Sequence, residues 1–570
     1  MFKDSKICIP FIKKMIYYVF LLITFILLIY RISIHADIYD EIINLDISYR
    51  VALGQVPFYD CWDSFQSGDL FMAPFLWLYL KIVGKSSGII LYSRFVYLGV
   101  LIITSIIIYY TFKEKCSRKL AFLIGYLFCF FQLYGLFYLW YDTTATILLV
   151  LGCLFLYQGI THKKYNKILI FLGGIFHGLM AFAYPSYILL AFLDTIVLFL
   201  FLFFQKKEKL KWGCFFIGGG FTVAFLFFLY IWFVIKPENF IETIKIILSY
   251  RSISSNSSHN IISSIIISFF KVNEITLLPT IILFSIFLVS LKYLKIEFFL
   301  IAGILLTAII NQILLPEDMR GLANFMGYLA LWTPFLYILK QRRAKEHDLA
   351  LILFLWLPSI LSSICVALLT VYSENGPIKS WQSFILGGII TIYLMCDYLL
   401  NCNFKRKQLY SNLCIISIIC VMLGIQYNYI YLNQSFHSLS NIRIKEGIYK
   451  GIRTNDSMKS WVEIQKIVQY YGKNEKTVLA GNRLRPIYLM TDLLPAVPTT
   501  EGPCYYKNGE YHWDMTIKFF ESHNVLPDIM FLEPYEIENK EIRNILKREY
   551  ELEGEEYIGE YSILIYKKSK

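Results

Sequence analysis

Residues 13–41 read KKMIYYVFLLITFILLIYRISIHADIYDE, and the order of charged and apolar residues in this stretch indicates how the chain is arranged. Two lysines precede Met15–Ile34, a mostly apolar run of the length that an α-helix needs to cross a bilayer. Asp37, Asp40 and Glu41 follow at once. Carboxylates beside a membrane are costly to desolvate, so they mark either a chemical site or a solvated loop. The stretch predicts a membrane helix with a cytoplasmic N-terminus and an acidic segment on the outer side.

The composition extends this interpretation to most of the chain. Of 570 residues, 57% are hydrophobic and 17% are charged. Apolar runs of about 17–25 residues recur, and clusters of basic residues separate them. Retaining every basic cluster in the cytoplasm gives one consistent topology in the cell membrane, with the C-terminus outside. We expect a mainly α polytopic membrane protein of about thirteen transmembrane helices, at residues 15–34, 89–112, 120–139, 143–160, 168–184, 186–204, 212–235, 275–291, 296–315, 321–339, 349–371, 380–400 and 409–432.

Three parts of the chain lie outside this predicted bundle: loop 35–88, loop 236–274 and the tail from residue 433. The tail alternates amphipathic helical stretches with short strand-like runs, namely Thr477–Ala480, Asp528–Leu532 and Ser562–Tyr566. We therefore predict two domains, a transmembrane module over 1–432 and a small extracytoplasmic α/β domain over 433–570.

The sequence disfavours several classes of function. No GxxxxGK[ST] loop is present for a nucleotide, which argues against an ATP-driven pump. No cytoplasmic segment is large enough to form a domain, which argues against a nucleotide-sugar enzyme working in the cytoplasm. No CxxC pair or His/Cys cluster has zinc spacing. The net charge of +12 lies mainly in short loops of the membrane part, so it does not indicate a nucleic-acid partner.

From the acidic segment onward, the chain resembles a known family. An Asp-Glu pair follows the first span, a helix then ends in G-x-x-P-[FY]-x-D, and a proline-led apolar stretch, Phe75–Val83, is too short to span a bilayer. This pattern resembles the polytopic GT-C glycosyltransferases, above all the branch related to protein mannosyltransferases and the aminoarabinose transferase of lipid A. The matching residues are Asp40, Glu41, Ala52, Gly54, Pro57, Phe58, Asp60, Pro74 and Arg94.

The resemblance implies an enzyme that takes a sugar from a polyprenyl-phosphate carrier and gives it, usually with inversion, to a glycan, lipid or protein acceptor outside the cytoplasm. Such an enzyme needs a carboxylate to accept the acceptor's proton and cations to stabilise the departing phosphate. The lipid-phosphate sugar is the donor. No cofactor is assigned, although Asp37, Asp40 and Asp142 would suit a shared divalent cation.

Four acidic residues are candidates for the catalytic carboxylates. The resemblance makes Asp40 the first choice for the general base. Asp37, about one helical turn earlier, is the second, and Glu41 would orient the base or the acceptor. Asp142 in the WYDTT segment is either a second carboxylate of the pocket or a cap of its helix. The remaining carboxylates of the first outer loop are expected to be solvated: Asp46, Asp60, Asp63 and Asp69.

Outward-facing cations are scarce under the predicted topology, and that scarcity makes them informative. Arg320, Arg94 and Arg251 are the preferred partners of the donor phosphate, because the guanidinium group binds phosphate through paired donors. The alternative for each is a side chain that extends to lipid headgroups.

Other functions stay open at the level of the sequence. His177 and Asp194 lie within apolar runs, and ionisable residues inside a membrane raise the prospect of transport. A lipid-linked glycan flippase or exporter is one alternative, and a polysaccharide polymerase or ligase is another. The chain lacks the paired broken helices in matching halves that are typical of secondary transporters.

Overall fold

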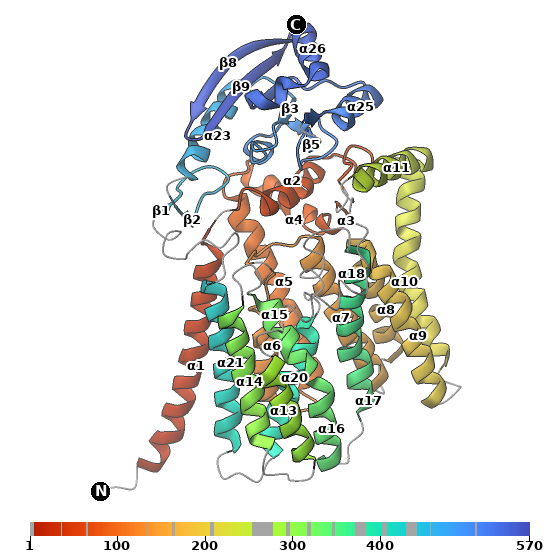
Figure 1. The fold of residues 1–570 in the computed structure, drawn as a ribbon, viewed down its shortest axis with the longest axis vertical. Coiled ribbons are helices and arrows are strands. Elements are labelled where there is room, and N and C mark those ends of the chain that lie inside the picture. Colours follow the sequence, from red (N-terminus) through yellow and green to blue (C-terminus); the bar gives the residue numbers. More distant parts are fainter. Residues whose placement is uncertain are drawn as a thin grey trace.

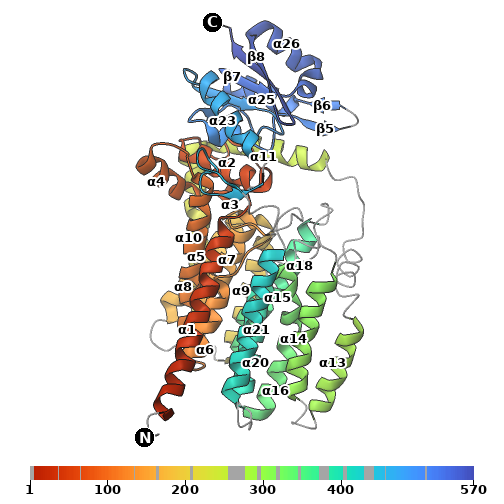
Figure 2. The ribbon, with the colours of Figure 1, turned by 90° about the vertical axis from the view of Figure 1, so that its left-hand side faces the viewer.

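The computed structural model describes residues 5–35, 37–63, 66–133, 135–161, 166–205, 210–253, 277–291, 297–315, 321–344, 348–370, 384–401, 407–428, 442–455, 458–507 and 510–569. These residues form three layers along the long axis of the molecule: a helical bundle, a thin layer of short helices and a C-terminal α/β domain (Figures 1 and 2). The N-terminus lies at the end of the bundle that is far from this domain. The predicted domain boundary at residue 432 falls outside the described residues.

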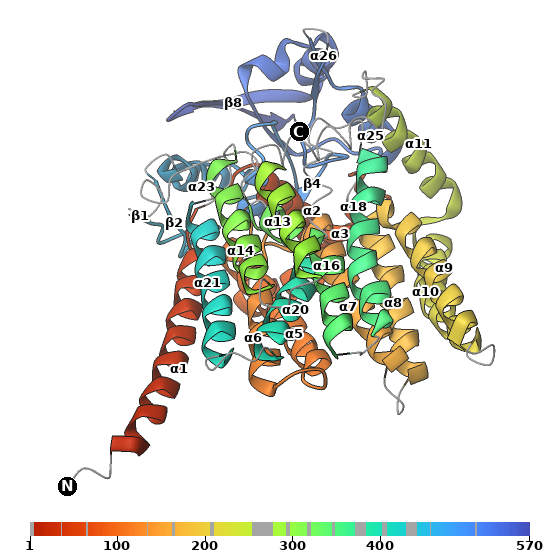
Figure 3. The same cartoon turned by 60° about the horizontal axis from the view of Figure 1, so that its bottom comes forward.

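The bundle is made of apolar helices that coincide with the predicted spans. Within the described residues, nine helical segments are long and apolar enough to cross a membrane, and three shorter apolar helices (α13, α14 and α20) lie beside them (Figure 3). The expectation of a mainly α polytopic membrane protein is confirmed. The helices are α1 (Ser5–Ile32), α5 (Ile89–Phe112), α6 (Arg118–Phe128), α7 (Tyr141–Thr161), α8 (Asn166–Ala183), α9 (Ile188–Gln205), α10 (Leu210–Tyr230), α13 (Leu277–Ser290), α14 (Glu297–Leu314), α15 (Leu322–Leu331), α16 (Thr333–Ala344), α17 (Leu349–Leu351), α18 (Leu357–Thr370), α20 (Ile385–Asn401) and α21 (Lys407–Asn428).

The third predicted span, 120–139, is wrong as a continuous helix. Helix α6 ends at Phe128, and the described residues 129–133 and 135–140 are not helical. Side-chain donors from three other helices compensate for the lost helical hydrogen bonds: Gln426 donates to Phe130 O (2.7 Å), Tyr97 to Phe131 O (3.0 Å) and Arg31 to Gly135 O (3.2 Å). Irregular backbone at membrane depth is tolerated where protein groups satisfy it in this way.

Glycines allow the helices of one half of the bundle to pack closely. A β-carbon at Gly174 of α8 would overlap the carbonyl oxygen of Phe216 in α10, and one at Gly219 would overlap the carbonyl oxygen of Phe171. Lipid tails are as apolar as leucine, so close contact between helices at small residues contributes much of the association energy in membranes. Helices α8 and α10 are therefore held at short range along this line.

The layer above the bundle consists of four helices: α2 (Asp40–Ala52), α3 (Gln66–Asp69), α4 (Ala73–Val83) and α11 (Pro237–Ile253). The short apolar stretch predicted after Pro74 is α4, which lies in this layer and does not span (Figure 1). Its inner side buries Ala73 and Leu76, whereas Trp77 and Ile82 are exposed. An apolar face that protein leaves uncovered suits a helix lying in the membrane interface.

The C-terminal domain is built on a five-stranded sheet of order β4-β3-β7-β9-β8. The three strands predicted from the sequence are present as β3, β7 and β9. β3 pairs in parallel with β4 and β7, and β9 pairs antiparallel with β7 and β8. The elements are β1 (Ile442–Arg443), β2 (Arg453–Thr454), α23 (Lys459–Tyr471), β3 (Thr477–Ala480), α24 (Ile487–Met490), β4 (Leu494–Pro495), β5 (Tyr505–Lys507), β6 (Glu510–His512), α25 (Asp514–His523), β7 (Ile529–Leu532), α26 (Lys540–Glu549), β8 (Tyr550–Ile558) and β9 (Tyr561–Lys568).

The substitution Gly174→Ala is expected to lower the thermal unfolding temperature of the purified protein, because the added β-carbon forces α8 away from α10. Overpacking of this kind typically costs about 1–3 kcal/mol. Gly99→Ala in α5 is the matched control, since a β-carbon there meets nothing within 4 Å. Unfolding followed by tryptophan fluorescence in detergent measures the effect. Equal midpoints for the two variants would contradict the close packing.

Candidate active site

The start of α2 holds three of the predicted catalytic residues. The carboxylate of Asp37 accepts the backbone N–H groups of Tyr39 (3.1 Å) and Glu41 (2.7 Å), which are free because they lie at the beginning of a helix. Burial raises the pKa of Asp37 to about 7, although these amide donors act in the opposite direction. Asp40 lies in the first turn of α2 and is partly exposed. The geometry of Asp37 is thus that of a helix cap.

Glu41 and Arg94 bind each other. Arg94 Nε donates to Glu41 Oε1 (2.7 Å) and Nη2 to Oε2 (2.5 Å), and both side chains are buried. The remaining terminal nitrogen of Arg94 donates to the carbonyl groups of Ile32 (2.9 Å) and Ile34 (3.3 Å). Paired donors on a carboxylate give strong and directional contacts. The pair ties α2 to α5 and to the end of α1, so the geometry favours a structural role for both residues.

The second half of α2 contributes a buried cation, Arg50. Its Nη2 donates to the carbonyl oxygens of Asp60 (2.6 Å) and Val497 (2.8 Å), and its Nε donates to Gln55 Oε1 (2.5 Å). Nη1 makes no hydrogen bond within the described part of the chain and lies 3.9 Å from Asp63 Oδ2. The guanidinium therefore places positive charge directly beside the Asp63 carboxylate.

Asp63 is held on both of its oxygens. Cys61 Sγ donates to Oδ2 (2.9 Å), and the Thr499 hydroxyl of the C-terminal domain donates to Oδ1. Gln66 fixes the local backbone, because its amide donates to Asp63 O (2.9 Å) and its carbonyl accepts the N–H of Phe58 (2.8 Å). Burial raises the pKa of Asp63, and Arg50 opposes that shift. The result is a preorganised carboxylate with elevated proton affinity.

The expectation that the other carboxylates of this loop are solvated is wrong for Asp46, Asp63 and Asp69. Their exposed fractions are 1%, 3% and 0%, because the C-terminal domain and α7 cover this part of the loop. Burial raises the pKa of Asp69, and the negative charges of Asp63, Asp142 and Glu501 raise it further. Asp142, the predicted second carboxylate, opens α7, is fully buried and belongs to this electrostatic group.

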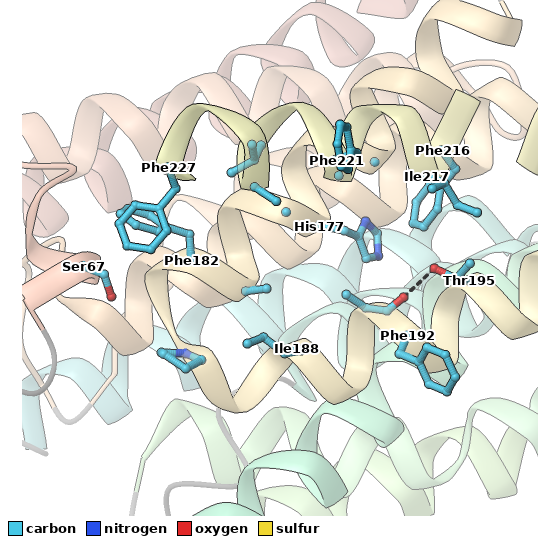
Figure 4. A pocket seen from close by; sticks show the side chains of 18 of the residues that line it. Ser67, His177, Phe182, Ile188, Phe192, Thr195, Phe216, Ile217, Phe221 and Phe227 are labelled. Carbon is cyan, nitrogen blue, oxygen red and sulfur yellow. Dashed lines mark hydrogen bonds between the residues drawn. The ribbon is translucent and has the colours of Figure 1, made fainter. Parts of the chain in front are cut away.

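A cavity of about 670 Å³, which we term the groove, lies between α8, α9 and α10 and is bordered by α11. Apart from Asp63, Ser67, His177 and Thr195, its lining is glycine, alanine, proline, aliphatic or aromatic. Figure 4 shows Ser67 at one end beside Phe182 and Phe227, and Phe216 and Ile217 at the other. A cavity with an apolar wall and a few placed polar groups is typical of a ligand site.

His177 and Asp194 pair within the bundle. His177 Nε2 lies 3.1 Å from Asp194 Oδ2, and Nδ1 lies 2.8 Å from Gly173 O. Both side chains are buried, and the His177 ring is visible on the wall of the groove (Figure 4). Each ring nitrogen has a partner within the bundle. Asp194 Oδ1, in contrast, makes no hydrogen bond within the described part of the chain.

The other predicted site residues lie away from Asp63 or beyond the described part of the chain. Asp40 and Arg50 are ten residues apart in α2, which corresponds to about 15 Å along a helix. Arg320 lies outside the described residues. Residue 251 belongs to α11, and only its backbone is described. Within the described residues, no group of three His, Cys, Asp or Glu side chains is arranged to hold a metal ion, and Asp37, Asp40 and Asp142 form no such group.

Sequence reasoning missed the roles of Asp63, Arg50 and Thr499. Asp63 and Arg50 lie 13 residues apart, and Thr499 is 436 residues further on than Asp63. No local pattern links them. Trp62 is the one local sign that Asp63 is buried. A large aromatic residue next to a loop carboxylate indicates that the loop packs against another part of the protein.

The comparisons with known proteins leave the family open. No protein-family model matches the chain, and no curated protein matches its sequence. Among solved structures, the chain is similar to the archaeal oligosaccharyltransferase AglB from Archaeoglobus fulgidus, in complex with an inhibitory peptide and a dolichol-phosphate. The TM-score is 0.46 and the identity 11%, over 91% of this chain and 70% of that chain. A likeness this distant assigns neither a family nor an activity.

The substitution Arg94→Ala is expected to destabilise the protein by roughly 3–5 kcal/mol, because it leaves the Glu41 carboxylate buried without its partner. The double variant Glu41→Leu/Arg94→Leu removes both charges and is expected to recover much of that loss. Thermal unfolding and the yield of monodisperse protein in detergent check both. A double variant that is as unstable as Arg94→Ala would show that an unpaired charge is not the cause.

Proposed function

We propose that the protein is a membrane glycosyltransferase that moves a sugar from a polyprenyl-phosphate carrier to an acceptor outside the cytoplasm. One observation carries the proposal: an apolar groove between membrane helices ends at the buried carboxylate of Asp63. A polyprenyl-phosphate sugar matches this arrangement, because its long apolar chain suits the groove and its phosphate and sugar follow at one end of that chain. The resemblance of residues 37–94 to GT-C enzymes points to the same chemistry.

The isoprenoid chain is proposed to lie in the groove, with its phosphate towards Ser67. Helix α11 contributes Phe240, Ile244 and Ile247 to the lining. Position 251 continues this series with helical spacing, which supports Arg251 as a partner of the donor phosphate. Arg320 is retained as a second partner from the sequence. Arg94 is not retained, because its donors are engaged by Glu41 and by carbonyl groups.

Asp63 is proposed as the general base. An acceptor hydroxyl or amine attacks the anomeric carbon of the sugar and gives its proton to the Asp63 carboxylate. The bond between the anomeric carbon and the phosphate oxygen breaks, and its electron pair leaves with the lipid phosphate. Attack opposite the leaving group inverts the anomeric centre. The raised pKa of Asp63 brings its proton affinity closer to neutral pH, where a base works best.

The site is proposed to face the outside of the cell membrane. The N-terminus and the turn between α5 and α6 lie at the opposite end of the bundle (Figure 1). That turn carries Lys113 and Lys115, α6 begins with Arg118 and Lys119, and positively charged segments of this kind are retained in the cytoplasm. A lipid-linked sugar is then the donor that suits the compartment.

The substitution Asp63→Asn is expected to lower the turnover of sugar transfer by about 10²–10⁴-fold, because the amide cannot accept the acceptor's proton. The assay supplies polyprenyl-phosphate sugars to the full-length protein in detergent or liposomes and measures labelled product. Asp40→Asn, which changes a partly exposed carboxylate in the first turn of α2, is the matched control. If Asp40→Asn loses sugar transfer and Asp63→Asn keeps it, Asp40 is the general base and Asp63 is not. Translocation of the carrier without covalent transfer would instead identify a flippase.

Filling the groove is expected to weaken donor binding without removing the site. Ala181 of α8 lines the groove, and Ala181→Phe adds an aromatic ring there. The variant is expected to raise the KM for the lipid donor about tenfold, equivalent to about 1.4 kcal/mol. Cys214→Phe adds the same bulk at an exposed position of α10 that does not line the groove. Transfer rates across donor concentrations separate the two. An unchanged KM in Ala181→Phe would place the lipid elsewhere.

A further inference from the structure

The C-terminal domain contacts the site through a short segment, residues 495–500. Its carbonyl groups accept three donors from the first outer loop: Gln55 Nε2 binds Pro495 O (2.7 Å), Arg50 Nη2 binds Val497 O (2.8 Å) and Trp62 N binds Pro498 O (2.7 Å). The backbone of the segment is therefore fixed against the residues on both sides of Asp63.

Thr499 is the residue of this segment whose side chain meets Asp63. Its hydroxyl donates to Asp63 Oδ1 and accepts the backbone N–H of Glu501 (3.0 Å). A hydroxyl has a single proton, so accepting from Glu501 directs that proton at the carboxylate. Thr499 is 6% exposed and Asp63 is 3% exposed, so water does not substitute for this contact.

We infer that Thr499 is a positioning residue for Asp63, so that the C-terminal domain completes the active site instead of only covering it. The inference rests on the proposed function. Thr499 orients one oxygen of the carboxylate while Cys61 and Arg50 fix the other, and Asp63 lines the groove. The domain that lies farthest from Asp63 in the sequence thus sets the geometry of proton transfer.

The charges around Asp63 determine the direction of the effect on pH dependence. Arg50 and the donors Thr499, Thr500 N and Cys61 lower the pKa of Asp63, and burial raises it. Among the acidic groups, Asp46 and Asp69 interact electrostatically with Asp63, and Asp142 and Glu501 act on Asp69. Removing the Thr499 hydroxyl removes one of the groups that stabilise the carboxylate, so the pKa of Asp63 rises. A general base acts when deprotonated, so the acidic limb of the activity profile moves to higher pH.

Thr499→Val tests the inference, because it keeps the shape of the side chain and removes the donor. In the full-length protein we expect kcat to fall by about ten- to a hundredfold, the effect of losing one hydrogen bond to a charged group. The acidic limb of the kcat profile is expected to move to higher pH, while the KM for the lipid donor stays near that of the wild type. Thr499→Ser keeps the hydroxyl and is expected to restore kcat and to return the acidic limb of the kcat profile to its wild-type pH.

Thr491→Val is the matched control, since Thr491 is about equally buried in the same domain and its hydroxyl accepts the N–H of Leu493 instead of contacting Asp63. If Thr499→Val does not fold, Thr499→Ala replaces it, with Thr499→Ser again as the rescue. A normal pH profile and normal kcat in the variant without the hydroxyl overturn the inference. Full transfer by Asp63→Asn, in contrast, overturns the proposed role of Asp63 and leaves Thr499 with no base to position.

Discussion

The structure depends on one buried guanidinium, that of Arg50. An arginine cannot lose its charge inside a protein, so its donors must find acceptors where water is excluded. Arg50 finds them in three parts of the chain: Gln55 at the end of α2, the carbonyl group of Asp60 in the following loop and that of Val497 in the C-terminal domain. These contacts require the loop layer and the domain to sit together. Its remaining donor nitrogen faces Asp63.

The burial that Arg50 stabilises gives the site its chemistry. Covering the loop with the C-terminal domain removes water from Asp63 and raises its proton affinity, and Arg50 limits that rise. The same layer borders the groove, whose walls come from α8, α9 and α10. Close packing at Gly174 sets the distance between two of those walls. The Asp63 carboxylate therefore depends both on the packing of the helices that form the groove and on the charges around it.

Much of the fold follows from local sequence, but the site does not. The apolar runs match the helices of the bundle, and Thr477–Ala480 forms the predicted strand, because hydropathy and periodicity reflect each residue's own burial. The helix break after Phe128 was not predictable, because it depends on donors from α1, α5 and α21. Asp40 and Asp63 look alike in sequence. Burial, the groove and a contact with Thr499, 436 residues away along the chain, distinguish the second.

The sequence by itself determined the membrane character, the approximate spans, the position of the acidic loop and the strands of the tail, since each depends on short-range patterns of apolar and polar residues. The tertiary structure alone decided which carboxylates are buried, which cations are already paired and where the groove ends. Those properties depend on which distant segments exclude water from a side chain. Exclusion of water turned Asp63 from an ordinary loop residue into the leading candidate for the base.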